Sequence, residues 1–356
     1  MPIPLILGLG AFTLGLYGAK KGLDAKDNND RAKDLRCEAE SIYNDSKGNL
    51  EQQRENTNDM LEKLGTTRIK LWADDLGYFI KTFKKFKNVS WEGNVAEDKF
   101  IKNGIESIDN LEATTIKAGE IVSAGMGSLA AGSLAGVAAY GGTMMLATAS
   151  TGTAISALSG AAAANATLAW LGGGSLAAGG LGIAGGTMVL GGIVAGPILA
   201  VAGAFMASKS EENLAKARKM HSEATEAAEK MDTMSDALKH IYKLADDYND
   251  FVLKFSRRFI PLVDQMEAVH SNSYEKQSKS LLNRIKSLFG VKFKVDFSKL
   301  NQEEQRVLHI SWIMAQSLHK LLSKNLIDAE GNADNTAKQL LIEYKENDLK
   351  KLAAYE

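Results

Sequence analysis

The chain has 356 residues, 42 basic and 43 acidic side chains, a formal net charge of −1 and one cysteine, Cys37. A chain without a basic excess is not typical of a nucleic-acid-binding protein, so we expect no nucleic-acid partner. A single cysteine excludes an intramolecular disulfide framework and a cysteine-based metal cluster, and it fits a reducing compartment.

The N-terminal segment, residues 1–21, is apolar up to the pair Lys20 and Lys21. Because the positive charges follow the apolar run, the segment lacks the order of a secretory signal peptide. Its length is near the minimum of about 18 residues for a membrane span. We expect either a membrane anchor, with the following residues cytoplasmic, or a buried helix docked on the uncharged central segment.

Residues 22–118 are rich in charge and predict amphipathic helices. The first, over 24–64, has a seam whose middle is polar. The seam residues recur at steps of three and four, as on one helix face: Ala32, Leu35, Ala39, Ile42, Ser46, Asn49, Gln53, Thr57, Met60 and Leu64. A further helix is expected at about 97–118, leading into an uncharged segment.

A second helix carries aromatic and aliphatic residues at the same steps: Ile69, Trp72, Leu76, Phe79, Phe83 and Phe86. Lysines lie between them, at Lys81, Lys84, Lys85 and Lys87. The pattern has two interpretations: contact with an anionic lipid surface, or a core stripe with solvated lysines. We favour the core stripe. The adjacent pair Asp74 and Asp75 is expected on a solvated face.

The interval 121–208 contains no Asp, Glu, Lys, Arg or His over 88 residues, and 20 glycines and 24 alanines make up half of it. A surface of that composition exposed to water would be one large apolar patch. We therefore expect residues 119–208 to be buried in protein, inserted in lipid, or able to do both.

Two stretches of the uncharged segment, Ile121–Leu146 and Ile183–Ala207, exceed the roughly 20 residues that cross a hydrocarbon core. They predict a membrane-inserting hairpin with both charged flanks on one side, compatible with the cytoplasmic side. The more polar stretch between them is a weak third segment, a re-entrant piece or a sequestered helix.

Small residues recur every four positions in this segment, which places them on one helix stripe where backbones approach closely. A composition of half Gly and Ala also produces such rows by chance, but three rows favour real packing seams. The residues expected to pack helices in the membrane are Gly132, Gly136, Gly182, Gly186, Gly192, Gly196, Ala200 and Ala204.

The glycines also weaken the segment as a span. Each helix-interior glycine costs about 1 kcal/mol relative to alanine, and strongly inserting residues are diluted. Such a marginal segment could sit inside a soluble helical shell and enter lipid later.

Residues 209–270 predict one long amphipathic helix with a heptad-like seam from Leu214 to Val269, kinked or interrupted near Phe259 by Pro261. The C-terminal region, 271–356, predicts a basic helix over 274–288, then strand-like alternation over 291–297 without an evident partner. Asn301 and Glu304 predict a capping box opening a helix over 302–323, and a last helix is expected over 336–352.

Catalytic and cofactor motifs are not evident. Gly180, Gly182 and Gly185 match GxGxxG, but no strand precedes them and no carboxylate lies about 20 residues on. The five histidines lack ligand spacing. The sequence predicts neither an enzyme nor a cofactor or metal site.

The run TASTGTAISALSGAAAANATLAWLGGGSLAAGGLGIAGGTMVLGGIVAGP over 148–197, with MPIPLILGLG…KKGLDAKDNNDRAKD at the start, resembles a family of uncharacterised bacterial proteins. The likeness covers the N-terminal two-thirds of the chain. In architecture, charged amphipathic helices around an uncharged small-residue hairpin are similar to pore-forming colicin domains and apolipoprotein L. That similarity implies membrane activity without assigning residues.

The sequence thus predicts an all-α protein: an elongated bundle of long amphipathic helices around a Gly/Ala-rich hydrophobic hairpin, with a small C-terminal helical region. The expected function is association with, or permeabilisation of, a lipid bilayer, with self-assembly along the small-residue rows. The expected location is a bacterial membrane, with a soluble cytoplasmic form before insertion. Two alternatives stay open: an integral-membrane scaffold that recruits a protein partner, and a soluble helical interaction module.

Overall fold

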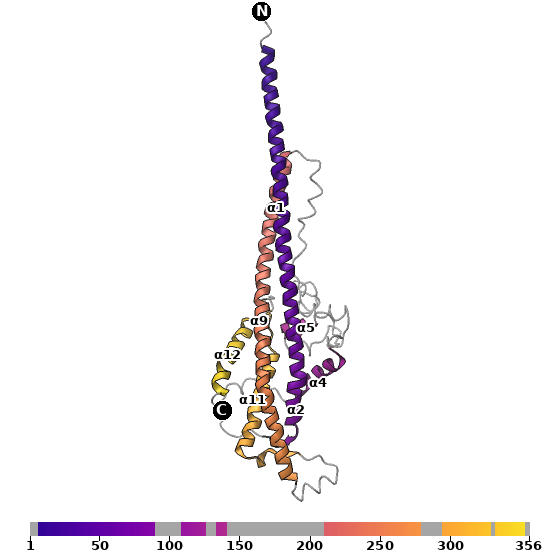
Figure 1. The fold of residues 1–356 in the computed structure, drawn as a ribbon, viewed down its shortest axis with the longest axis vertical. Coiled ribbons are helices and arrows are strands. Elements are labelled where there is room, and N and C mark those ends of the chain that lie inside the picture. The colour runs from indigo at the N-terminus through magenta and orange to yellow at the C-terminus, as the bar shows by residue number, and fades with distance from the viewer. Residues whose placement is uncertain are drawn as a thin grey trace, which may run out of the picture. The chain divides into compact units, whose positions relative to one another are not determined.

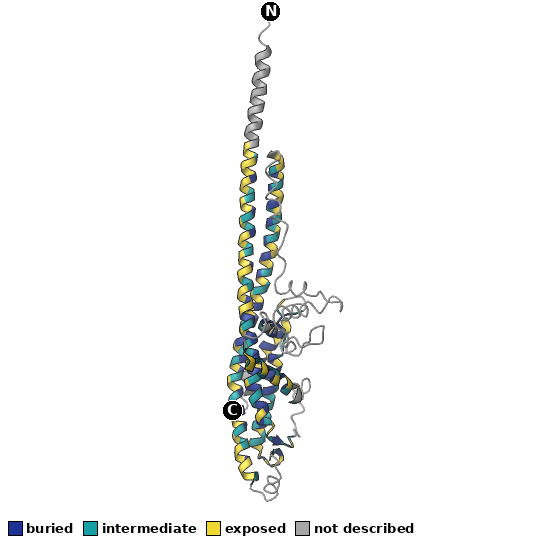
Figure 2. Cartoon of the chain, turned by 90° about the vertical axis from the view of Figure 1, so that its right-hand side faces the viewer, coloured by how far each residue is buried: buried dark blue, intermediate teal, exposed yellow. Residues whose placement is uncertain are grey.

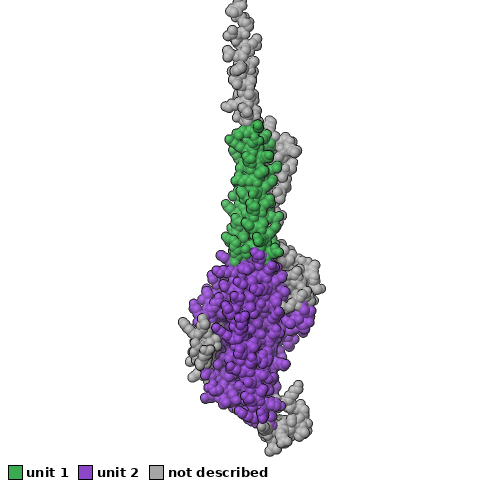
Figure 3. Space-filling view, in the orientation of Figure 1, with its two compact units in different colours: residues 1–55, 192–239 green, residues 56–191, 240–356 purple. Residues whose placement is uncertain are grey.

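The computed structural model describes residues 6–89, 108–125, 133–140, 210–278, 294–328 and 332–352, with the backbone alone for 6–25, 347–352 and a few residues within helices. These residues are almost entirely helical, which confirms the all-α prediction (Figure 1). The chain divides into two compact units, residues 1–55 with 192–239 and residues 56–191 with 240–356 (Figure 3).

Two long helices contribute to both units: α1, Ile6–Lys70, and α9, Ser210–Ser278. In the first unit these two helices lie parallel. Asn29 of α1 contacts Asn213 of α9 and, further along both helices, Glu38 contacts His221. A small apolar seam joins them: Ala32, Ala39, Tyr43, Leu50, Leu214, Ala217, Met220, Ala224 and Met231. The seam expected along α1 is therefore corrected at its centre, where Tyr43 and Leu50 are buried and Asn49 is exposed.

The second unit is a bundle around the C-terminal parts of α1, from residue 56, and of α9, from residue 240 (Figure 2). After Lys70 the α1 helix continues through a π-helical turn, η1, Leu71–Leu76, into α2, Gly77–Phe83. The two helices expected over 24–64 and 69–86 are thus one continuous run. The aromatic stripe faces the core, where Trp72, Phe79 and Phe259 are fully buried, as the core interpretation predicts.

The α9 helix keeps the predicted seam, with Ala245, Tyr248 and Val252 fully buried. It does not end near Phe259, and it runs without a break through the expected boundary at 270. Proline removes the hydrogen bond to the carbonyl four residues earlier, but Pro261 and Arg257 both lie on the exposed face. Water can satisfy that carbonyl, so the helix continues.

The remaining elements of the second unit are α4, Ile108–Ala124; α5, Ser133–Tyr140; α11, Gln302–Leu322; and α12, Asn335–Leu352. The predicted capping box opens α11, since Asn301 and Glu304 each accept from the backbone N–H of the other. The strand-like residues do find a partner: β2, Val295–Asp296, pairs in parallel with β1, Phe86–Lys87, and a 3-10 turn, η8, Phe297–Lys299, follows.

Candidate functional site

Helix α5 lies within the uncharged segment, and its sequence SLAGVAAY combines five small residues with Leu134, Val137 and Tyr140. Ala135, Val137, Ala138 and Ala139 are all buried in the second unit. This part of the uncharged segment is therefore packed against charged amphipathic helices. Its contacts define a docking site, which consists of Gly65, Arg68, Leu326 and Ile327, together with Tyr248 and Lys324, which contact Arg68.

The C-terminal end of α5 is capped by groups from other elements. The last four carbonyls of a helix have no partner within it. Arg68 donates from Nη1 to the carbonyl oxygens of Val137, at 3.1 Å, and Ala138, at 2.9 Å. The backbone N–H groups of Leu326 and Ile327 both donate to the Ala139 oxygen, at 2.7 and 3.2 Å. A cation at this end of a helix also interacts favourably with the helix dipole.

The Arg68 guanidinium is fully buried, and among the described residues it has no carboxylate partner. Its Nη2 donates to the backbone oxygen of Lys324 at 2.9 Å, and its Cζ lies 5.4 Å from the centre of the Tyr248 ring. Burial lowers the pKa of Arg68 to about 10, although Tyr248 opposes the shift. The charge is thus balanced by backbone carbonyls and an aromatic face.

Gly65 provides the close approach between α1 and α5. A β-carbon at this position would overlap the carbonyl oxygen and carbon of Leu134. Only a residue without a side chain permits this contact, so the position needs glycine for space. The tight helix contact observed here is between a charged helix and the uncharged segment.

The carbonyl of Lys324 is positioned by the end of α11. Ser323 caps that helix through the His319 carbonyl, and His319 is buried beside Trp72, whose Nε1 lies 3.4 Å from His319 Nδ1. Asp334 accepts from Thr336, and hydrogen bonds and the Lys324 ammonium keep its pKa low despite burial. The loop after α11 is therefore held in place from both sides.

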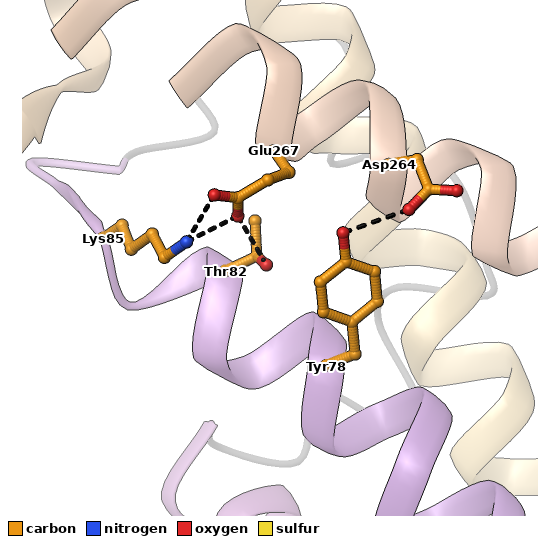
Figure 4. Close-up of polar contacts among 5 residues, drawn as sticks. All are labelled: Tyr78, Thr82, Lys85, Asp264 and Glu267. Carbon is orange, nitrogen blue, oxygen red and sulfur yellow. Dashed lines mark hydrogen bonds and ion pairs between the residues drawn. The ribbon is translucent and has the colours of Figure 1, made fainter. Parts of the chain in front are cut away.

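The four lysines for which lipid contact is the less favoured interpretation have varied environments. Lys84 pairs with Glu112 of α4, and Lys85 donates to both carboxylate oxygens of Glu267, at 2.5 and 2.6 Å. Figure 4 shows Lys85 and Thr82 converging on Glu267, while the Tyr78 hydroxyl donates to Asp264. Lys81 is exposed and Lys87 is half-buried. Two of the four are thus engaged by carboxylates within the bundle.

Asp75 departs from the solvated position expected for it. It is 9% exposed and accepts a hydrogen bond from the Ser256 hydroxyl at 2.5 Å. Burial raises the pKa of Asp75, the Ser256 hydrogen bond lowers it and Asp74 raises it further. Adjacent side chains point in different directions around a helix, so Asp74 is exposed while Asp75 is buried.

The small-residue rows fall mostly outside the described residues. Gly136 lies in α5, of which the backbone alone is described at that position, and the following lie beyond the described ranges: Gly132, Gly182, Gly186, Gly192, Gly196, Ala200 and Ala204. Sequence reasoning missed Gly65 and Arg68. The signal for them was a helix-interior glycine in a charged helix, followed by an arginine beside the apolar residues Ile69, Leu71 and Trp72.

The stretch Ile121–Leu146, expected as one span, is not one helix. Helix α4 ends at Ala124, and Gly125 has a φ of 88°, a left-handed conformation that commonly ends helices. Within the described part of the chain, no helix has both the length and the apolar character that a membrane crossing requires. The second expected span, Ile183–Ala207, lies outside that part.

The described residues contain no cluster of His, Cys, Asp and Glu suited to a metal ion. No family model, curated protein or solved structure matches the chain.

Proposed function

We propose that this chain is a membrane-associating helical protein whose uncharged segment enters a bilayer and permeabilises it. The observation that carries the proposal is the 88-residue interval 121–208 without a charged side chain, half of it Gly and Ala. Such a segment tolerates hydrocarbon, where a charged side chain at mid-depth would be costly. The small residues support close helix pairing in lipid, and with it self-assembly.

The contacts of α5 support a conditional form of this activity. In the second unit, residues 133–140 are packed among charged helices, and their terminal carbonyls accept from Arg68 and from the loop after α11. A segment that is only marginally apolar can exchange such contacts for lipid at a small free-energy difference. The proposal therefore has a docked form and an inserted form, with a bacterial membrane as the target and cytoplasmic charged helices.

A soluble interaction module is the second candidate, and the burial of α5 favours it. In that function the uncharged segment would remain a Gly/Ala-rich core, and the long helices α1 and α9 would bind a protein partner. An integral-membrane scaffold without pore activity is the third. None of the three requires a catalytic residue or a cofactor.

Fractionation and dye release separate these functions. The full chain is purified without detergent, mixed with vesicles of phosphatidylcholine and phosphatidylglycerol, and assayed by flotation and by leakage of a trapped dye. A soluble protein that floats and causes leakage supports the proposal, and carbonate-resistant membrane residence from synthesis supports the scaffold. A soluble protein inert to lipid at every pH tested overturns the proposal in favour of the module.

The small-residue rows have their own test. Gly192→Leu and Gly196→Leu should force apposed backbones apart and reduce both crosslinked oligomers and leakage. Gly48→Leu is the matched control, because Gly48 is an exposed helix position with open space around it. If both assays are unchanged in the Gly192 and Gly196 variants, the packing hypothesis is wrong.

A further inference from the structure

The α5 side chains that the structure describes are mostly small. Three alanines and one valine are buried, Ala135, Val137, Ala138 and Ala139, and Leu134 is half-buried. Alanine buries little apolar area, so the hydrophobic contribution of these alanines to docking is modest. The hydrogen bonds from Arg68 and from the loop 326–327 add to the attachment.

The carbonyls that accept these hydrogen bonds are also needed in a membrane span. In a span over 121–146, the oxygens of Val137, Ala138 and Ala139 would accept from the N–H groups of the next turn. A helix that crosses hydrocarbon must satisfy every backbone group internally. In the docked form, a guanidinium and two loop amides donate to the same oxygens.

We propose that Gly65, Arg68 and the amides of Leu326 and Ile327 form an autoinhibitory latch. The latch holds α5 docked within the second unit, and its opening frees α5 to enter the bilayer. Release exposes the Arg68 guanidinium to water, which removes the cost of its burial. The inference rests on the proposed function, because it describes how insertion is restrained.

The test measures docking and membrane binding separately, in the full chain. Cys37, which is exposed, is replaced by serine, and Ala138→Cys places a thiol at a fully buried position. The rate of maleimide labelling then reports undocking without lipid. The latch variants are Arg68→Lys and Gly65→Ala. Arg68→Lys keeps the positive charge but loses the two guanidinium nitrogens that donate to backbone oxygens. Their matched controls are Arg31→Lys and Gly48→Ala, both at exposed positions of α1.

Loss of these contacts should raise the labelling rate by about tenfold or more in the latch variants and leave it unchanged in the controls. Flotation with vesicles of phosphatidylcholine and phosphatidylglycerol should increase in the same variants. A folding check by circular dichroism accompanies each variant. Should one variant fail to fold, hydrogen exchange of residues 133–140 is measured without lipid in the other variant, with faster exchange expected than in the unmodified chain.

Three outcomes would contradict the proposed latch, and each has a different meaning. Unchanged labelling or exchange shows that Arg68 and Gly65 do not hold α5, and overturns the latch. Faster labelling with flotation equal to that of the unmodified chain shows that undocking does not restrain insertion, which overturns the latch and leaves the proposed function intact. Faster labelling with no flotation of any variant overturns the proposed function, and the latch as a restraint on insertion falls with it.

Discussion

Gly65 and Leu134 lie so close that a β-carbon on the glycine would overlap the leucine carbonyl. The contact joins a charged helix to the segment of the chain that carries no charge. One turn further along α1, Arg68 caps the other end of the same short helix. Two neighbouring positions on one helix thus define where the uncharged segment packs.

Alanine at position 65 should destabilise the fold, whereas alanine at position 48 should stabilise it. At Gly48 the substitution meets nothing and gains helix propensity of up to about 1 kcal/mol. At Gly65 it forces two backbones apart, at a cost of about 2 kcal/mol that exceeds this gain. Urea unfolding followed by circular dichroism measures both. Equal effects at the two positions would show that α5 does not pack against Gly65.

Arg68→Met should lower the free energy of unfolding by about 3 kcal/mol, because the buried carbonyls of Val137, Ala138 and Lys324 lose their donor. Arg31→Met is the control. Arg31 forms a surface ion pair with Asp27, and its loss should change stability by no more than about 0.5 kcal/mol. If Arg68→Met is as stable as Arg31→Met, water or other groups donate hydrogen bonds to these carbonyls in place of Arg68, and the prediction is wrong.

Asp75→Asn should stabilise the protein at neutral pH and have little effect in acid. The folded-state pKa of Asp75 is raised, mainly by burial. Stability linked to its protonation is therefore fully present below the unfolded pKa of about 4 and lost as pH rises through the folded pKa. Asparagine removes that loss and still accepts from Ser256. Chemical unfolding at neutral and at acidic pH measures the change in stability, and Asp59→Asn, at an exposed position, is the control. Equal changes in stability for Asp75→Asn and Asp59→Asn at both pH values would refute the prediction.

The Lys85–Glu267 pair should show a coupling of up to about 1 kcal/mol at neutral pH, since both side chains are about a third exposed. Burial raises the pKa of Glu267, but hydrogen bonds from Lys85 and Thr82 lower it below its usual value. The stability that the ionised Glu267 gives the fold is present above the unfolded-state pKa of this carboxyl, and it is lost as the pH falls through the folded-state pKa. A double-mutant cycle with Lys85→Met and Glu267→Gln measures the coupling, and a value of zero at neutral pH contradicts the pairing.

Long seams and local caps were predictable because they depend on residues near in sequence. The heptad spacing from Leu214 onward identifies the buried face of α9, and Asn301 with Glu304 identifies the start of α11. The spacing does not reveal whether two helices pack parallel or antiparallel, because the same apolar seam is compatible with both orientations. The parallel arrangement of α1 and α9 follows from contacts such as Thr67 with Asn249 and, further along, Asp75 with Ser256.

The docking site could not be predicted because its partners lie far apart in the chain. Arg68 contacts residues 69, 70 and 256 positions away, and each acceptor is a backbone oxygen, which every residue has. Asp75 likewise contacts Ser256, 181 positions away. No local pattern at either residue specifies these partners.

The central claim, that the uncharged segment enters hydrocarbon, is tested most directly with a tryptophan inside an expected span. Trp170 lies between the two expected spans, so Val194→Trp, within Ile183–Ala207, is compared with the unmodified chain. Vesicles with brominated acyl chains quench tryptophan only at close range within the bilayer. Stronger quenching in Val194→Trp than in the unmodified chain is the predicted result. Quenching of Val194→Trp no greater than that of the unmodified chain would contradict the claim.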